Sequence, residues 1–389
     1  MKVFLDKHAI GLDRSVIVED DIIKFSDIVS APEGFWHLQD RAHMSLKRVA
    51  DSTGAALDTV PDDPRVNWWL QFDSHCRYDF VLGKDKFLKY LNRVIKQAKS
   101  VVETAPYYTS TYQRQNALLD KLRPAHIRQD EESIDLAGVL GIAHTQAGEC
   151  EIASYDNYSS STGRMSIKTG PKILTMNKSH RHVFESRWKD EGILLGVDYN
   201  ALEPRFLLNV MGTNTSGMDV YNHIGAAAKI TSIPRETLKT MILACLYGMA
   251  RRNFIVKFID TPECDVAYDA LREVLGVDYM LSKIKEGIVE GKIKNHFGRP
   301  LSCDNESVML NHFTQSSAVD VACDGFLEFV SSMSDVVEPI FLIHDELVVD
   351  VRKDSLEKVT DFCKNGLYVP ILETRFPVKT KVFNARKDH

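Results

Sequence analysis

Two aspartates at the ends of apolar segments are the first residues in this sequence that could carry chemistry. Asp198 ends the apolar run 192–197, and Asp345 lies between two β-rich runs, 339–343 and 347–351. An ionised carboxylate at the end of a buried strand is costly unless it is paired or binds a metal ion. If the strands are neighbours, both acids converge on a site for hard cations. Two Mg²⁺ ions about 3.5–4 Å apart can drive an in-line phosphoryl displacement. Either acid alone is more simply a turn or cap residue.

A second candidate group lies on a helix that we expect to begin after Pro234. Residues 235–249 contain no helix breaker except Gly248, and proline is favoured at a helix start because its missing N–H is not needed there. Four side chains, each four residues apart, share one face of this helix: Arg235, Lys239, Leu243 and Tyr247. Two cations followed by an aromatic ring match a nucleoside triphosphate, with the polyphosphate at the cations and the base at the ring. Alone, the pattern is equally typical of a surface helix with a buried tyrosine.

The combination of these motifs resembles the family A DNA polymerases, the group of bacterial DNA polymerase I and many phage replicases. Three segments are similar, in order, to motifs A, B and C of that family: Asp198-Tyr-Asn-Ala-Leu-Glu203-Pro-Arg205, Arg235-x3-Lys239-x7-Tyr247-Gly248 and His344-Asp345-Glu346. Four more resemble its TGR, G-x6-GR, N-x3-Q and late VP segments: Thr162-Gly163-Arg164, residues 291–299, Asn311-x3-Gln315 and Val369-Pro370. The resemblance covers residue 141 to the C-terminus and is to a small phage-type form without an exonuclease domain.

The resemblance implies a role for each matching residue. Asp198 and Asp345 would bind two Mg²⁺ ions, with Mn²⁺ as a substitute, and Glu346 would support them near the primer end. Lys239 would also protonate the departing pyrophosphate, and Glu203 would disfavour a 2′-hydroxyl by its bulk beneath the sugar. The implied nucleotide-binding residues are Arg235, Lys239, Tyr247, Glu203, Leu243 and Tyr221. The implied DNA-binding residues, which would contact chiefly the minor groove, are Arg164, Asn311, Gln315 and His344.

The sequence also departs from the family pattern. Leu243 stands where the family usually has Phe or Tyr, which affects sugar discrimination and base stacking. The family's D-I-H triplet, whose histidine contacts phosphate, reads Asp219-Val220-Tyr221, so Tyr221 or the nearby His223 would substitute or the contact would be lost. The family's PNLQN reads Pro171-Lys-Ile-Leu-Thr, which weakens a template contact there. None of these changes removes a metal ligand.

The elements that must position these residues are expected to form an α/β right-hand polymerase fold with palm, fingers and thumb. We expect a mainly antiparallel palm sheet, with helical fingers and thumb. The expected divisions are an N-terminal region of unknown role (1–75), a thumb (76–140), a first palm segment that carries motif A (141–211), fingers that carry motif B (212–299) and a second palm segment that carries motif C (300–389).

A basic helix is expected within the thumb division. Residues 82–128 carry ten basic and three acidic side chains, whereas the whole chain has a formal net charge of −6. Over residues 84–103 apolar side chains recur at helical spacing, including Leu88, while Lys89, Lys96 and Lys99 lie on the other side. Such a face is either simply solvated or lies along a DNA phosphate backbone.

Composition excludes several other classes of protein. The chain has 389 residues, 44% of them hydrophobic and 26% charged, as in folded proteins rather than disordered or fibrous ones. Its seven cysteines include no CxxC pair and are expected to be reduced thiols. We find neither a secretory signal nor an apolar run of membrane-spanning length, so we expect a soluble protein in the cytoplasm of a bacterial or phage-infected cell. Trp36, Trp68 and Trp69 are expected to be core residues, or else to dock a partner.

We therefore expect a template-directed DNA polymerase that adds dNMP to a primer 3′-OH by a two-metal mechanism. Its expected partners are primer-template DNA and dNTPs, with no membrane. We expect no 3′–5′ exonuclease of its own, because no D-x-E motif ends an apolar strand near the N-terminus; a separate exonuclease or processivity subunit could dock on residues 1–75. Two alternatives stay open. A single-subunit RNA polymerase shares the aspartates, the lysine and Tyr-Gly, although Glu203 favours deoxynucleotides; an inactive replication scaffold would bind DNA without chemistry.

Overall fold

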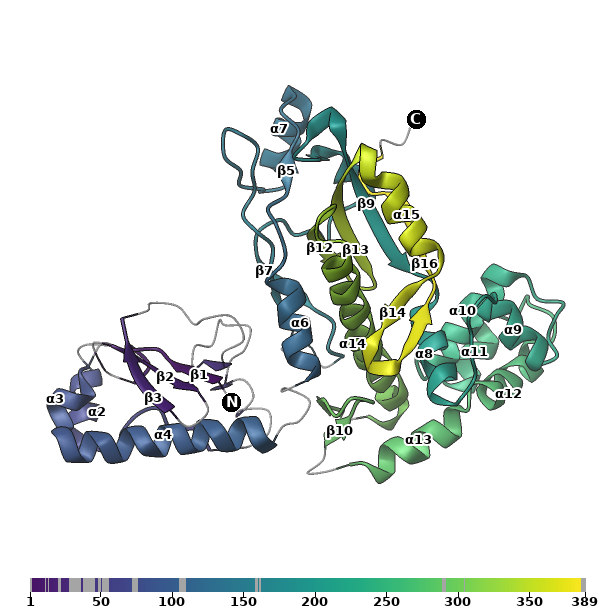
Figure 1. Cartoon of the computed structure of the whole chain (residues 1–389). Helices are drawn as coiled ribbons and strands as arrows, with labels where there is room; N and C mark the ends of the chain where they lie inside the picture. The colour runs from purple at the N-terminus through teal and green to yellow at the C-terminus, as the bar shows by residue number, and fades with distance from the viewer. Residues whose placement is uncertain are drawn as a thin grey trace. The chain divides into compact units, whose positions relative to one another are not determined.

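The chain folds into two compact units, residues 1–117 and 118–389 (Figure 1). The computed structural model describes residues 2–10, 12, 14–19, 22–27, 36–37, 46–47, 50, 56–71, 76–104, 110–157, 160, 162–288, 292–303 and 305–385. The division expected between residues 75 and 76 falls inside the first unit. The unit boundary itself falls within the region expected to be the thumb.

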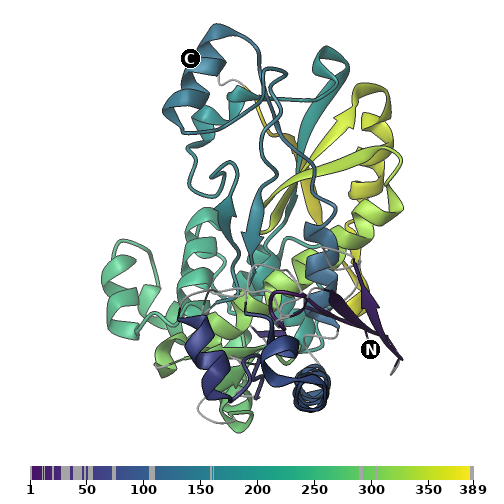
Figure 2. The same cartoon turned by 90° about the vertical axis from the view of Figure 1, so that its left-hand side faces the viewer.

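The first unit combines a small sheet with helices. Its four strands pair in the order β3-β2-β1-β4. Strands β1, β2 and β3 are labelled in purple in Figure 1, and Figure 2 shows the same part of the chain turned by 90°. Their bounds are β1 (Lys2–Leu5), β2 (Ser15–Glu19), β3 (Ile22–Ser26) and β4 (Trp36–His37). The helices of this region are α2 (Pro64–Leu70), α3 (Tyr78–Leu82), α4 (Lys84–Thr104) and α6 (Thr111–Leu119), the last of which crosses the unit boundary.

Helix α4 confirms the expected basic amphipathic helix. Its apolar side chains are buried at Phe87, Leu91, Val94 and Ile95, because residues three and four apart share one helix face. Lys89 and Lys96 are exposed, and Lys99 is partly exposed. Leu88, expected on the apolar face, is 41% exposed.

The tryptophans of the first unit divide into two kinds. Trp36 is buried and stacks on Tyr112 with ring centroids 6.0 Å apart, which confirms a core role. Trp68 and Trp69 are 55% and 47% exposed, so the core interpretation is wrong for them. Together with Phe80 they line an apolar pocket of about 670 Å³.

A four-stranded antiparallel sheet forms the centre of the second unit. Its order is β12-β13-β9-β16, with β12 (Val337–Ile343), β13 (Glu346–Arg352), β9 (Gly192–Tyr199) and β16 (Val378–Val382). Strands β12 and β13 form the expected hairpin, and β9 pairs with both β13 and β16. The centre of β9 carries Ile193, Leu194, Leu195 and Val197, because a central strand is covered by its neighbours and its side chains are largely buried. The expectation of a mainly antiparallel sheet is confirmed.

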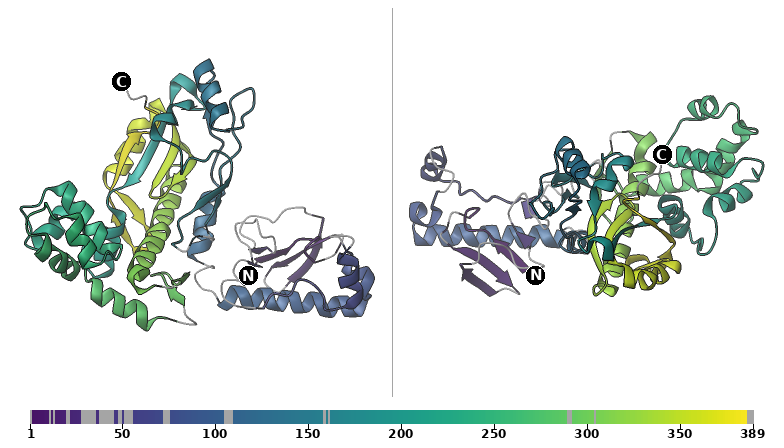
Figure 3. Two further views of the ribbon diagram at one scale, coloured as in Figure 1. Left: turned by 180° about the vertical axis from the view of Figure 1, so that it is seen from behind. Right: turned by 90° about the horizontal axis from the view of Figure 1, so that it is seen from above.

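Helix α14 (Met309–Ser332) runs along one face of this sheet (Figures 1 and 3). It is buried around most of its circumference, and its buried positions include polar side chains such as Thr314, Gln315 and Asp320 as well as apolar ones. Phe326 of α14 contacts Tyr199 at the end of β9, with ring centroids 5.0 Å apart. Phe329 contacts Phe362 of α15 (Leu356–Lys364), so both helices cover the same face.

A group of helices follows β9. These are α8 (Leu202–Val210), α9 (Val220–Ala227), α10 (Arg235–Leu246), α11 (Arg251–Lys257), α12 (Cys264–Val274) and α13 (Val277–Glu286). Helix α10 begins after Pro234 as expected but ends at Leu246, three residues early. Gly248 explains the difference, because its φ of +73° is left-handed and reverses the chain.

The remaining described elements are short. They are α7 (Glu131–Val139), the pairs β5–β8 (His126–Ile127, Phe184–Glu185), β6–β7 (Ser154–Asp156, Ser166–Thr169), β10–β11 (Lys292–Lys294, Pro300–Ser302) and β14–β15 (Leu367–Val369, Thr374–Phe376), and five 3-10 segments. All seven cysteines are free thiols, as expected. Within the described ranges, no helix has the length and apolarity needed to cross a membrane.

Asp350, a buried aspartate in β13, should make stability depend on pH. It is 1% exposed, and burial raises its pKa from 3.8 to about 6. The folded chain therefore binds this proton more tightly than the unfolded chain, and stability is lost as pH rises from about 4 through 6. Asn at this position keeps an oxygen that can accept from the Arg187 N–H, a bond of 2.8 Å in the wild type. We expect Asp350→Asn to gain stability relative to wild type between pH 4 and 7.5, on the order of 3 kcal/mol. Urea denaturation at both pH values measures this; a constant difference between the two proteins would contradict it.

Candidate active site

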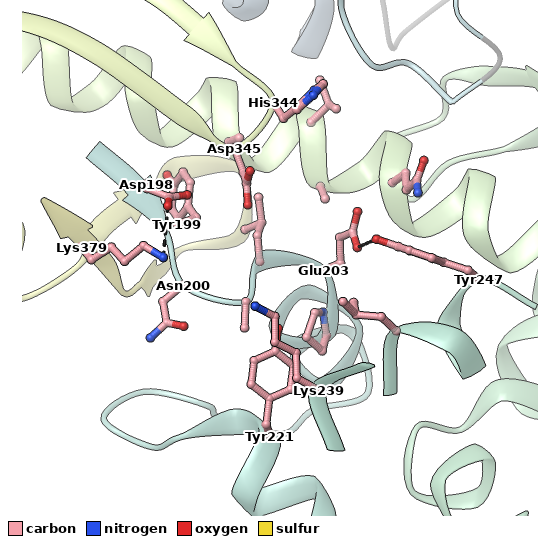
Figure 4. A pocket seen from close by; sticks show the side chains of 18 of the residues that line it. Asp198, Tyr199, Asn200, Glu203, Tyr221, Lys239, Tyr247, His344, Asp345 and Lys379 are labelled. Carbon is pink, nitrogen blue, oxygen red and sulfur yellow. Dashed lines mark hydrogen bonds and ion pairs between the residues drawn. The ribbon is translucent and has the colours of Figure 1, made fainter. Parts of the chain in front are cut away.

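A pocket of about 510 Å³ opens in the second unit where the end of β9, the β12–β13 turn and the helices meet (Figure 4). Eleven of the residues singled out in the sequence line it: Arg164, Asp198, Glu203, Tyr221, Arg235, Lys239, Leu243, Tyr247, Gln315, His344 and Asp345. Glu346 and Asn311 are not among the lining residues. Lys89, Lys96 and Lys99 belong to the first unit.

The two aspartates lie on the same side of this pocket (Figure 4). Asp198 is the penultimate residue of β9, and Asp345 lies in the tight turn between β12 and β13. The Tyr199 N–H donates to the Asp345 carbonyl oxygen at 3.0 Å, which joins the strand end to the turn. His344 begins that turn with a φ of +57°, a left-handed conformation that few residues adopt. Non-local strand pairing therefore brings together two acids that are distant in sequence.

The electrostatics of Asp345 indicate uncompensated negative charge. Burial, and then the neighbouring charge of Asp198, raises the pKa of Asp345 to about 6. No ion pair joins the Asp345 carboxylate to a basic side chain among the described residues. A divalent cation would neutralise both acids, and carboxylate oxygens are the ligands that Mg²⁺ prefers.

The residues present fit such an ion with few protein ligands. Within the described ranges no group of three or more His, Cys, Asp or Glu side chains could hold a metal ion. Mg²⁺ is commonly bound by one or two carboxylates, with water and substrate phosphates as the other ligands. Asp198 and Asp345 match that arrangement in number and kind.

Helix α10 presents its predicted stripe to the pocket. Arg235, Lys239, Leu243 and Tyr247 all line the cavity. The Arg235 Nε donates to Asp219 Oδ2 at 2.6 Å, and Asp219 in turn caps α9. Lys239 makes no ion pair with the described part of the chain. Arg235 also pairs with Glu236 at 2.7 Å, so Lys239 is the positive charge of α10 that has no carboxylate partner among the described residues.

Tyr221 lies against these cations. Its ring centroid is 5.3 Å from the Arg235 guanidinium carbon and 6.0 Å from Lys239 Nζ. It is 5% exposed, and burial raises its pKa to about 12. His223, the alternative for the D-I-H position, is exposed and does not line the pocket. Of the two candidates, Tyr221 is therefore the one near the anion-binding end.

Glu203 joins two other pocket residues by hydrogen bonds. Its Oε2 accepts from the Tyr247 hydroxyl at 2.5 Å, shown as a dashed line in Figure 4, and its Oε1 accepts from Arg164 Nη2 at 3.1 Å. Burial raises the pKa of Tyr247, and the negative charge of Glu203 raises it further. The tyrosine therefore stays neutral and donates to the carboxylate. Glu203 sits in the first turn of α8, which begins directly after the left-handed Ala201.

The segments that resemble the family's TGR and G-x6-GR motifs, residues 162–164 and 291–299, also lie close together. Arg299 is buried, and its Nη2 donates to the Asn157 carbonyl oxygen at 2.7 Å. A Cβ on Gly163 would lie 2.8 Å from Arg299 Nη1, so the glycine permits this close approach. Gly291, at the start of the GR segment, lies outside the described residues.

The DNA-binding candidates of the second unit are only partly brought together. Arg164, Gln315 and His344 line the pocket, and burial followed by the charge of Arg164 lowers the pKa of His344. Asn311 lies one helical turn before Gln315 on α14 and has a buried Oδ1 without a hydrogen-bond partner among the described residues. Its expected contact with DNA stays a prediction.

Glu346 lies opposite Asp198 in the sheet but does not line the pocket, because basic side chains hold its carboxylate. Its Oε1 lies 3.1 Å from Lys381 Nζ, its Oε2 lies 3.8 Å from Arg181 Nη1, and its side chain is 7% exposed. Two lysines that sequence reasoning missed, Lys379 and Lys381, approach Asp198 from β16. An alternating Lys-x-Lys in the last strand was visible in the sequence, but the partner of that strand was not.

Comparisons with known proteins support a polymerase-domain fold. One solved structure that is similar is the POL domain of Pol1 from M. smegmatis, in complex with DNA primer-template and dNTP. The TM-score is 0.50 at 15% sequence identity, over 84% of this chain and 56% of that one, so this chain spans little more than half the length of its neighbour. No protein-family model matches the sequence. A search of curated proteins finds no match either.

Proposed function

We propose that this chain is a template-directed DNA polymerase of the family A kind that adds dNMP from dNTPs to a primer 3′-OH. The observation that carries the proposal is a single pocket that combines a carboxylate pair with a cationic helix face. Asp198 and Asp345 lie on one side of the pocket and Lys239 on another (Figure 4), and Arg235, one helical turn before Lys239, also lines the pocket. Metal-dependent phosphoryl transfer needs both an acidic metal site and a cationic polyphosphate site.

Each wall has its own role in the mechanism. Asp198 and Asp345 would hold two Mg²⁺ ions, or Mn²⁺. When bound, the ions supply the charge that activates the primer 3′-oxygen and stabilises the leaving phosphate. Arg235 and Lys239 would bind the triphosphate, and Lys239, which has no competing ion pair among the described residues, would protonate pyrophosphate as it leaves. The Tyr221 ring would pack against the Arg235 and Lys239 side chains and limit their movement.

The rest of the chain would serve as the hand that holds DNA. The antiparallel sheet would be the palm, α9 to α13 the fingers, and residues 76–140 the thumb. Arg164, Gln315, His344 and Asn311 would contact the primer-template, and the exposed lysines of α4 would contact its phosphates. We also propose that the enzyme is of the small phage type and has no exonuclease of its own. It would work in the cytoplasm with a separate exonuclease or processivity subunit.

Extension of a labelled primer on a template by the purified chain tests the proposal. With Mg²⁺ and dNTPs, the primer should lengthen to the template end. Preference for NTPs over dNTPs would favour the RNA polymerase alternative. Binding of DNA without any extension would favour the inactive scaffold.

Glu203 provides a test of sugar selection. If its side chain fills the space beneath the nucleotide C2′, Glu203→Ala should raise incorporation of NTPs relative to dNTPs by about tenfold, since a lost steric contact of this size is worth roughly 1–3 kcal/mol. Glu203→Gln is the matched control, because it keeps the bulk and an oxygen that can accept from Tyr247. Single-nucleotide incorporation kinetics measure kcat/KM for each sugar. The same ratio in Glu203→Ala and wild type would remove Glu203 from sugar selection.

A further inference from the structure

The register of the central sheet places two lysines beside Asp198. Lys379 of β16 lies directly opposite Asp198 of β9, and Lys381 lies opposite Gly196. Directly paired residues have side chains on the same face of a sheet. Lys379 Nζ lies 3.2 Å from Asp198 Oδ2, and Lys381 Nζ lies 3.4 Å from the same oxygen. Two ammonium groups thus share one carboxylate oxygen of the proposed metal site.

The two lysines differ in how firmly they are held. Lys381 Nζ also lies 3.1 Å from Glu346 Oε1, and Glu346 is nearly buried beside Arg181. Gly196 makes room for this arrangement, since a Cβ there would lie 2.2 Å from Glu346 Oε1 and 3.4 Å from Lys381 Cε. The side chain of Lys379 is 63% exposed, and among the described residues it forms an ion pair with Asp198 alone. Lys381 is therefore anchored, whereas Lys379 is able to swing into solvent.

We propose that Lys379 is a built-in counter-ion that occupies Asp198 until a divalent cation binds, and so sets the metal affinity of the site. The inference rests on the proposed function in one respect, that Asp198 is a metal ligand. Asp345 has no such partner among the described residues, so the competition acts on one of the two acids. Lys379 is a positioning residue, since it acts through Asp198.

Simple electrostatics gives the direction of the effect. A divalent cation at Asp198 is repelled by an ammonium group at 3.2 Å from the same carboxylate, so Lys379 must withdraw before the ion binds. Withdrawal gives up an ion pair, and that loss weakens metal binding. Because Lys379 is largely exposed, solvent screens the interaction and keeps the effect modest. Removal of the lysine should tighten binding about threefold.

Binding of Mn²⁺ to the full chain, without DNA or nucleotide, tests this inference. Electron paramagnetic resonance of free Mn²⁺ gives the dissociation constant independently of activity. Lys379→Ala should bind Mn²⁺ about threefold more tightly than wild type, and Lys379→Arg should resemble wild type. Lys358→Ala is the matched control: Lys358 is exposed, pairs with Asp335 at 2.9 Å and does not line the pocket. It should leave Mn²⁺ affinity unchanged.

Further outcomes decide against the inference. Equal or weaker Mn²⁺ binding by Lys379→Ala, including no binding by either protein, would overturn it. So would tighter binding that persists when Asp198→Asn is added, because the ion would then lie elsewhere. Primer extension by wild type decides the proposed function separately. An enzyme that extends primers while Lys379→Ala binds Mn²⁺ like wild type would refute this inference alone.

Discussion

Asp198→Asn or Asp345→Asn is expected to reduce primer extension by about a thousandfold or more, while the affinity for primer-template DNA stays within about twofold. Asparagine keeps the shape of aspartate but loses the charge that binds a cation. Both residues line the pocket, and burial, followed by the negative charge of Asp198, raises the pKa of Asp345 to about 6. Single-turnover extension under saturating dNTP measures the first quantity, and fluorescence anisotropy of labelled DNA measures the second.

Asp350→Asn is the matched control for this pair. Asp350 is also an aspartate of the central sheet, but it is buried in β13 and does not line the pocket. Its replacement removes one carboxylate charge from the same sheet and should leave extension unchanged. Wild-type activity in Asp198→Asn or Asp345→Asn would mean that the pocket is not the active site.

Gly248→Ala is expected to destabilise the fold by about 3 kcal/mol or more. Two causes add: the φ of +73° disfavours any side chain, and a Cβ there would lie 1.6 Å from the Ser307 carbonyl oxygen. A backbone atom is unable to move aside as a flexible side chain would. The shift should also displace Tyr247 and its hydrogen bond to Glu203. Chemical denaturation gives the free energy of unfolding.

Gly212→Ala separates the two causes. Gly212 has a φ of +84°, but a Cβ there meets no atom within 4 Å. Only the backbone strain remains, which costs roughly 1 kcal/mol. Similar losses for both variants would show that the contact with Ser307 relaxes freely and that Gly248 does not fix the end of α10.

The sequence by itself determined the local elements and their chemical side chains. The helix after Pro234, with Arg235, Lys239, Leu243 and Tyr247 on one face, follows from the helical repeat and the proline start. The hairpin around Asp345 and the strand that carries Asp198 near its end follow from short apolar runs that include β-branched residues. Helix α4 follows from its apolar periodicity. These features depend on neighbours within a few residues, so a single sequence is enough to read them.

Only the tertiary structure decided which strands pair and where the paired side chains go. That β16 lies beside β9, with Lys379 opposite Asp198, depends on the register between strands about 180 residues apart. Glu346 follows Asp345 directly and pairs with Asp198 across the sheet, yet its carboxylate contacts Lys381 and Arg181 and does not line the pocket. Trp36 is buried whereas Trp68 and Trp69 are exposed, although all three are equally apolar in sequence. Pairing, register and burial are set by packing of the whole unit, because they depend on which distant surfaces meet.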